Sequence, residues 1–150
     1  MKISSWLPGC FLAAAVFCAA SGSASASPRE ACSALSLADV RGLVGAQVSV
    51  FQQASFGPTK HTDSTISNCT YVVLGANGHP ALGRSAKVTL MWAPKARLAE
   101  ANKTYLQRRM EASALKGDTL VLAWVGDPSR GAEGDWEASQ KLLAAVLKKL

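Results

Sequence analysis

Cysteine and histidine are the side chains of this sequence best suited to chemistry. The chain holds four cysteines and two histidines. A cysteine thiolate can act as a nucleophile or a metal ligand, whereas two cysteines in an oxidising compartment form a disulfide. The role of these cysteines therefore depends on the compartment in which the protein folds.

The first 26 residues predict a secretory signal peptide. Lys2 gives a short positive region, residues 11–20 (FLAAAVFCAA) an apolar run, and Ala24-Ser25-Ala26 a cleavage signal. The apolar run is about half as long as the roughly 20 residues that a membrane-spanning helix needs. We therefore expect residues 27–150 to form a single exported domain, periplasmic or secreted, with no transmembrane segment after cleavage.

Export decides how the cysteines are interpreted. Cys10 and Cys18 fall within the signal peptide, and neither fits a lipid-attachment site, so Cys32 and Cys69 belong to the exported domain. An even count in a small exported domain indicates one disulfide. A reactive or metal-binding pair would need a C-x-x-C spacing or further ligands, and the sequence has neither. We predict a Cys32–Cys69 disulfide.

Both histidines lie in polar segments. His61 and Asp63 stand in the run K-H-T-D, and His79 lies among glycine, asparagine and proline. These side chains could share a metal ion only if the two segments met in space. Metal sites usually show paired ligand spacings on ordered elements. We therefore expect no metal or other cofactor, and a metal-dependent enzyme or minor hydrolase is the weakest of three functional hypotheses.

Catalysis by other side chains has little support. No serine stands in a G-x-S-x-G or S-x-x-K frame, and no G-x-G-x-x-G or Walker-type loop is present. One acidic cluster lies where a loop meets a predicted helix start, which favours a local electrostatic role; it consists of Asp127, Glu133, Asp135 and Glu137. We expect a non-enzymatic protein.

Basic residues give the strongest candidate for a binding surface. Cleavage removes one of the 16 basic residues, Lys2, and none of the ten acidic ones, so the net charge falls from +6 to +5. A helix predicted from Pro94 to about Leu115 could present a basic surface to an anionic lipid, an anionic glycan or an acidic protein. This surface would consist of Lys95, Arg97, Lys103, Arg108 and Arg109. A solvated helix face is the alternative, and nucleic acid is not expected after export.

Periodicity predicts the elements of the first half. Ser36 to Asp39 matches a helix-capping pattern, and Leu37–Val44 has helical spacing. Apolar alternation predicts three strands, at Gln47–Gln52, Asn68–Leu74 and Ala86–Trp92. Gln53–Ser67 has no sustained period, which predicts a long surface loop or an irregular hairpin.

The second half adds helices and one further strand. The segment from Pro94 to about Leu115 is rich in strong helix formers. Thr119–Val125 is apolar on both faces, which predicts a central strand covered in part on each side. Gly126–Gly134 is typical of a loop, and an amphipathic helix starts at Asp135. The order α-β-β-β-α-β-α predicts an α+β fold, with an antiparallel sheet of about four strands and helices mainly on one face.

Short motifs in the first third of the exported domain resemble small bacterial envelope proteins of unknown function. The motifs are Cys32 to Val40 (CSALSLADV), Leu43-Val44-Gly45 and Asn68 to Tyr71 (NCTY). Many such proteins are lipoproteins. The resemblance implies an exported domain of this architecture with a disulfide, and it implies no particular activity.

Three functional hypotheses follow. The leading one is a non-enzymatic exported domain that binds a protein partner or an anionic envelope component. The second is an inhibitor that inserts its loop at 53–67 or at 126–134 into an extracytoplasmic enzyme, since a rigid scaffold with long polar loops suits that role. The third is the enzyme described above.

Overall fold

The computed structural model describes residues 29–44, 51–74, 77, 79–109 and 111–150. The predicted signal peptide, the start of the first predicted strand at 47–50 and part of the predicted turn at 75–80 lie outside the described residues. The described helices are the short 3-10 helix η1 (Ala31–Ser33), α1 (Leu37–Val44), α2 (Lys95–Arg108) and α3 (Gly131–Lys149). The described strands are β1 (Phe51–Lys60), β2 (Thr65–Leu74), β3 (Pro80–Trp92), β4 (Ala112–Lys116) and β5 (Thr119–Gly126).

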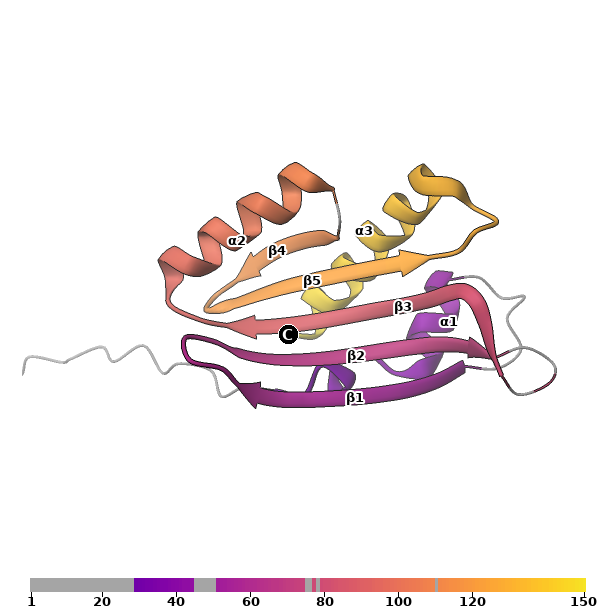
Figure 1. Ribbon diagram of the computed structural model, residues 1–150, viewed down its shortest axis with the longest axis horizontal. Coiled ribbons are helices and arrows are strands. Elements are labelled where there is room, and N and C mark those ends of the chain that lie inside the picture. The colour runs from indigo at the N-terminus through magenta and orange to yellow at the C-terminus, as the bar shows by residue number, and fades with distance from the viewer. Residues whose placement is uncertain (1–28, 45–50, 75–76, 78, 110) are drawn as a thin grey trace, which may run out of the picture.

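All five strands join one antiparallel sheet in the order β1-β2-β3-β5-β4 (Figure 1). The first three strands are neighbours both in sequence and in the sheet. α2 then carries the chain from β3 to the far edge, where β4 forms, and β5 returns to pair between β3 and β4. The last strand therefore lies inside the sheet, with a partner on each side.

Helices cover the two faces of the sheet unequally. α1 and α3 pack with η1 on one face, in the main core that contains Tyr71 and Val146. α2 packs on the opposite face, where Leu98 lies in a second cluster with Leu120 and Leu122. The α+β fold and the antiparallel sheet are confirmed. The prediction of helices mainly on one face holds for α1 and α3, whereas α2 covers part of the other face.

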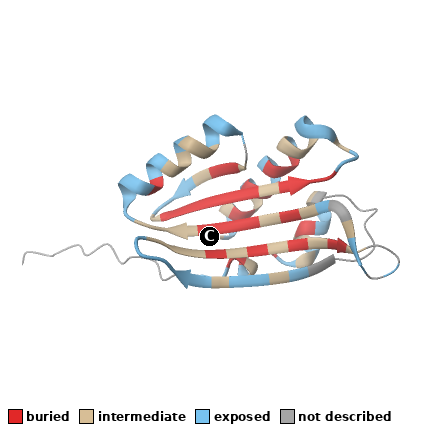
Figure 2. Ribbon diagram, in the orientation of Figure 1, coloured by how far each residue is buried: buried red, intermediate tan, exposed pale blue. Residues whose placement is uncertain are grey.

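The sequence of β5 matches its two-sided burial (Figure 2). Val121 and Ala123 belong to the core under α3, whereas Leu120 and Leu122 belong to the cluster under α2. Successive side chains of a strand point to opposite faces, so a strand between two helical layers needs apolar residues throughout. The central strand predicted at Thr119–Val125 is confirmed, and the observed strand extends one residue further, to Gly126.

The disulfide attaches the segment before α1 to the middle of β2. Cys32 and Cys69 are bonded, with their Cα atoms 4.9 Å apart, as predicted. The amide of Ala31 donates to Ser67 Oγ at 2.9 Å, and the Tyr71 hydroxyl donates to the Leu35 carbonyl at 3.0 Å. Burial, with a smaller effect of the nearby Asp39 charge, raises the pKa of Tyr71 to about 12. Gln53 Nε2 also donates to the Cys32 carbonyl at 3.4 Å, so the disulfide and hydrogen bonds to both β1 and β2 hold the segment.

Residues 53–67, predicted as a long loop or an irregular hairpin, form an irregular hairpin. Most of it belongs to β1 and β2, whose register shifts between Phe56 and Thr59. Gly57 adopts φ 89° before a cis bond to Pro58. A Cβ at Gly57 would lie 2.6 Å from the Ile66 carbonyl oxygen, so glycine is required there. This irregularity interrupts the alternation, which is why the strands are not evident from periodicity.

The helix predicted from Pro94 to about Leu115 is too long. α2 ends at Arg108, and Arg109 takes the left-handed conformation with φ 48°. Residues 112–116 form β4 instead, so the sheet has five strands and the observed order gains a strand before β5. Their side chains are good helix formers, but pairing with β5 buries Ala112 completely and outweighs that preference. α3 likewise begins at Gly131, four residues before its predicted start at Asp135.

Removal of the disulfide should lower the free energy of unfolding by about 4 kcal/mol, because the cross-link restricts the unfolded chain over a separation of 37 residues. The measurement is urea unfolding of residues 27–150 with Cys32→Ser and Cys69→Ser together, against the oxidised parent. The reduced parent is the matched control and should unfold with the double variant. Equal midpoints for the oxidised parent and the variant would contradict the prediction.

Candidate functional site

The face of the sheet opposite α1 and α3 is partly uncovered, and we call it the open face. Its residues follow from the register: Ala54, Thr70, Lys87 and Trp124 lie opposite one another across β1, β2, β3 and β5. A second row contains Phe56, Asn68, Thr89 and Leu122. α2 packs over β4 and β5, and Phe56 at the other edge is 63 % exposed.

An ion pair spans the strand that carries Trp124. Lys87 of β3 and Glu111, just before β4, approach to 2.6 Å between Nζ and Oε1, with side chains 37 % and 13 % exposed. β5 lies between these two strands. A hollow of about 340 Å³ lies here, and we call it the Trp124 hollow. It is lined by Thr70, Lys87, Glu111 and Trp124.

Polar atoms on this face differ in how well they are satisfied. The Thr89 hydroxyl donates to Asn68 Oδ1 at 2.6 Å, so these two side chains complete one another. The second carboxylate oxygen of Glu111, Oε2, is buried and has no hydrogen-bond partner among the described residues, and the same holds for Ser113 Oγ. A buried acceptor without a donor costs free energy that a bound donor would recover.

A groove runs beside α2 on the same face, and we call it the α2 groove. Its volume is about 420 Å³, and it is lined by Met91 of β3 and by Arg97, Glu100, Ala101, Thr104, Tyr105 and Arg108 of α2. Met91 and Lys87 lie on one strand and one face, four residues apart, which corresponds to roughly 13 Å along the strand. The α2 groove and the Trp124 hollow therefore follow one another along β3.

The structure separates the five basic residues predicted to form one surface. Arg97 and Arg108 line the α2 groove, and Arg97 is ion-paired to Asp63 at the β1–β2 turn. Arg109 points elsewhere: it lies 4.9 Å from the Trp136 ring and pairs with Glu133. The other two, Lys95 and Lys103, are exposed and do not line the groove. Two of the five residues thus remain as candidates for contact with an anion in the groove.

The two histidines lie beyond opposite ends of β2. His61 precedes its first residue and His79 follows its last, and a strand of ten residues spans roughly 33 Å. The condition on which the metal hypothesis rested, a meeting of the two segments, is not met. Within the described residues no three His, Cys, Asp or Glu side chains are placed to hold a metal ion.

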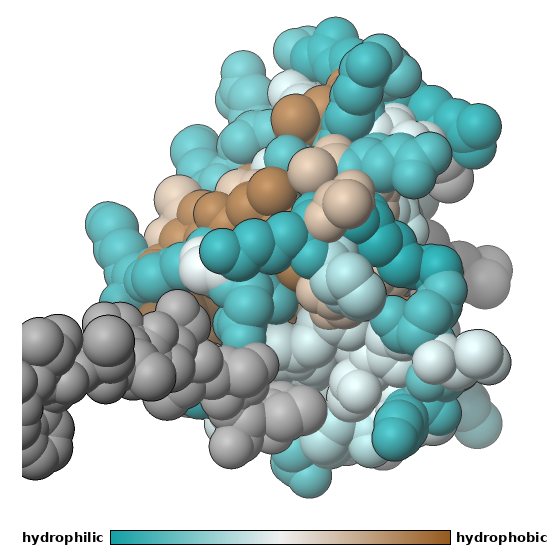
Figure 3. All heavy atoms as spheres, turned by 90° about the vertical axis from the view of Figure 1, so that its left-hand side faces the viewer, coloured by the Kyte–Doolittle hydropathy of each residue, from teal (hydrophilic) through white to brown (hydrophobic). Residues whose placement is uncertain are grey.

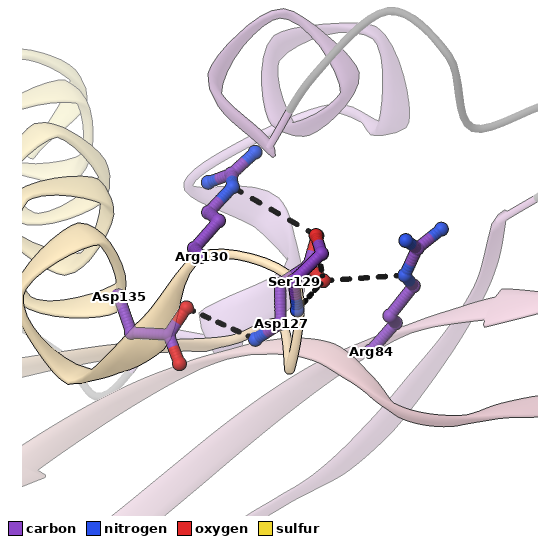
Figure 4. Close-up of polar contacts among 5 residues, drawn as sticks. All are labelled: Arg84, Asp127, Ser129, Arg130 and Asp135. Carbon is purple, nitrogen blue, oxygen red and sulfur yellow. Dashed lines mark hydrogen bonds and ion pairs between the residues drawn. The ribbon is translucent and has the colours of Figure 1, made fainter.

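The predicted acidic cluster is built around Asp127, between β5 and α3 (Figure 4). Its carboxylate accepts from the Ser129 amide at 3.0 Å and hydroxyl at 2.7 Å, and pairs with Arg84 at 3.3 Å and Arg130 at 3.8 Å. The Asp127 amide in turn donates to Asp135 Oδ1 at 3.0 Å. These contacts fix the connection into α3, which is a structural role.

Hydrogen bonds dominate the electrostatics of this cluster. The hydroxyl and then the amide of Ser129 lower the pKa of Asp127, burial opposes them, and Arg84 and Arg130 lower it further. A carboxylate held ionised in this way is a poor general acid or base near neutral pH. Of the other two predicted members, Glu133 pairs with Arg109, and Glu137 is exposed on α3.

The two loops considered as alternatives for an inhibitor lie at opposite ends of the sheet. The hairpin at 53–67 turns at the end of the sheet where β3 finishes, and the segment at 126–134 lies at the other end, where β3 starts. The second segment is also shortened, because α3 begins at Gly131.

Apolar side chains reach the surface as a band at the end of the molecule that carries the β4–β5 turn (Figure 3). Leu115 is 42 % exposed there. A hollow of about 350 Å³ lies at this end, lined by Arg29, Trp92, Lys116, Gly117, Asp118, Thr119 and Leu150. Arg29 is the first described residue, and nothing in the described chain shows what contacts this band.

Comparison with known protein families, curated proteins and solved structures finds no match. The resemblance to small envelope proteins therefore stays a prediction. None of the described helices combines the length and apolar character needed to cross a membrane. Inference about function rests on the geometry of the open face.

Sequence reasoning missed the Trp124 hollow. Lys87 lies within the strand predicted at Ala86–Trp92, but Glu111 falls in the helix predicted from Pro94 to about Leu115. Lys87 and Glu111 meet only because α2 carries the chain across the sheet and β4 then pairs with β5. No local sequence pattern predicts either of these features. The one available signal was Trp124 in an otherwise aliphatic strand.

Asp127→Asn should lower the free energy of unfolding by about 1 kcal/mol at pH 7, because hydrogen bonds to a charged acceptor are stronger than those to an amide. The native pKa lies below that of the unfolded chain. The contribution is therefore complete above about pH 5 and is lost as the pH falls through the native pKa, below about 4. Denaturant unfolding across this range measures it. The exposed Glu137→Gln is the charge-matched control, and a difference between Asp127→Asn and the parent that persisted at low pH would contradict the assignment.

Proposed function

We propose that this chain is an exported, non-enzymatic binding domain that holds an anionic envelope component on its open face. The observation that carries the proposal is the α2 groove, which combines Arg97 and Arg108 with the apolar side chains of Met91 and Ala101 on a partly uncovered sheet face. The disulfide and the predicted signal peptide support export, because cross-links of this kind persist in oxidising compartments.

The charges of the groove favour an anion near Arg108. Arg97 already pairs with Asp63, and Glu100 also lines the groove. Arg108, exposed at the end of α2, has no ion-pair partner among the described residues. Guanidinium groups bind carboxylates and phosphates through two parallel hydrogen bonds. Arg108 is therefore the residue expected to contact the anion.

Binding is favoured over catalysis by the way the polar side chains are used. The Asp127 carboxylate is saturated by Ser129 and two arginines, and Thr89 is paired with Asn68. His61 and His79 lie at the two ends of β2, so the two imidazoles cannot act on one substrate group. A partly uncovered face with aromatic and basic side chains suits recognition of a ligand.

Arg108→Gln should weaken retention on an anionic ligand about tenfold, in the range of a lost charged hydrogen bond. The matched control is Lys103→Gln, which removes one exposed charge from the same helix outside the groove and should change retention by much less. The measurement is binding of residues 27–150 to immobilised alginate and to phosphatidylglycerol vesicles at low salt. Equal losses for the two variants, or no binding of the parent to either, would contradict the proposal.

A further inference from the structure

We propose that the Trp124 hollow binds a sugar ring, so that the anionic ligand of the open face is an acidic glycan. This inference rests on the proposed function and specifies its ligand. The hollow is lined by an aromatic ring, a hydroxyl and an ion pair, from Trp124, Thr70, Lys87 and Glu111. All four residues are partly exposed. Glu111 Oε2 itself is buried, so a ligand contacts this oxygen only after a rotation of the Glu111 side chain toward the hollow.

The state of Glu111 indicates which chemical group is missing. Its charge is already balanced by Lys87 at 2.6 Å, while Oε2 is buried without a hydrogen-bond donor in the described chain. A second cation would add an excess positive charge to a neutral pair, at the cost of its own desolvation. A neutral donor satisfies the oxygen at no such cost. The group that fits Oε2 is therefore a hydroxyl or an amide N–H.

Trp124 indicates the shape of the ligand around that donor. The indole belongs to a row between Lys87 and Glu111, and lines a second hollow of about 230 Å³ on the side of Trp136. A flat aromatic surface binds groups that combine an apolar face with a polar rim. A pyranose has this form, with C–H groups on its faces and hydroxyls around its edge. Thr70 and Lys87 can bind further hydroxyls on the rim.

The position of the hollow connects it to the charge of the α2 groove. Lys87 and Met91 lie roughly 13 Å apart along one face of β3, and Arg108 and Glu111 flank the same connection between α2 and β4. An extended chain of sugars with acidic substituents can place a ring on Trp124 and a carboxylate at Arg108. An acyl chain could fill the apolar part of the groove but would leave Glu111 Oε2 without a donor.

A pair of polyanions separates recognition of hydroxyls from recognition of charge. Alginate oligomers and peptide-free peptidoglycan strands carry carboxylates on sugar rings, whereas polyacrylate carries carboxylates without rings or hydroxyls. Calorimetric titration of residues 27–150 should give tighter binding to at least one of the two glycans than to polyacrylate of equal charge, by roughly tenfold for one or two additional hydrogen bonds.

Substitutions assign that difference to the hollow. Trp124→Leu should remove most of the preference for the glycan and leave polyacrylate binding unchanged, because the indole carries no charge. Glu111→Gln should also remove most of the preference, but because it leaves Lys87 without its ion-pair partner it should strengthen polyacrylate binding as well. Trp124→Phe keeps a flat ring and should retain most of the preference. Glu137→Gln, on exposed α3 surface, is the charge control for Glu111→Gln. Thermal unfolding of each variant verifies that it is folded.

The outcomes distinguish the two proposals. Equal affinity for the glycans and polyacrylate, or a glycan preference that survives Glu111→Gln and Trp124→Leu, overturns the sugar site while the anionic face stands. Binding to phosphatidylglycerol vesicles alone assigns the face to lipid and also overturns the sugar site. Absence of binding to every anion tested overturns both proposals.

Discussion

The disulfide between Cys32 and Cys69 is the constraint that decides which face of the sheet is covered. It holds η1 against β2, where Ala31 and Leu35 add hydrogen bonds to Ser67 and Tyr71. Ser67, Cys69 and Tyr71 of β2 therefore face η1. Because strand side chains alternate, Asn68 and Thr70, which lie between them, must point to the other side. One covalent bond thus assigns the core face of β2 and, through the register of β1 and β3, the open face of the sheet.

The unequal cover of the two faces gives the molecule its usable surface. α1 and α3 complete a core with β2, β3, β4 and β5 on one face, whereas α2 covers the half formed by β4 and β5 on the other. The boundary between the covered and uncovered halves is where Met91, Lys87 and Trp124 meet side chains from α2 and Glu111. A stable core on one side therefore leaves the other side free to contact a ligand without loss of packing.

The edges of this sheet also bear on its use as a binding surface. Unpaired edge strands invite association with other strands. β1 carries the Gly57–Pro58 irregularity and ends at Lys60, and β4 is only five residues long. Both are features that discourage pairing with another chain. We therefore consider the face of the sheet, and not its edges, as the site of binding.

Much of the fold could be predicted from local patterns. Ser36 and Asp39 form the reciprocal cap that their spacing indicates, with the Asp39 amide donating to Ser36 Oγ at 3.2 Å and the Ser36 amide donating to Asp39 Oδ2 at 3.0 Å. The disulfide followed from export and an even cysteine count. β4 could not be predicted, because its residues favour a helix and become a strand only when β5 pairs with them.

The candidate site was less predictable than the fold. Arg97 and Arg108 were named on the basis of charge, but the separation of Arg109 depends on Trp136 of α3, which is distant in sequence. Glu111 reaches Lys87 only after the chain has crossed the sheet. The proposed binding site combines residues of β2, β3, β5 and the α2–β4 connection. Their proximity is a consequence of topology, whereas sequence periodicity indicates only single elements.

The most direct test of the account is to locate the ligand on the sheet by NMR. Amide chemical shifts of residues 27–150 should be followed during titration with a glycan that binds. The account predicts the largest changes at Thr70, Lys87 and Trp124, with the amides of α1 and the C-terminal half of α3 unchanged. Largest changes on α1 and α3, with the open face unaffected, would contradict it.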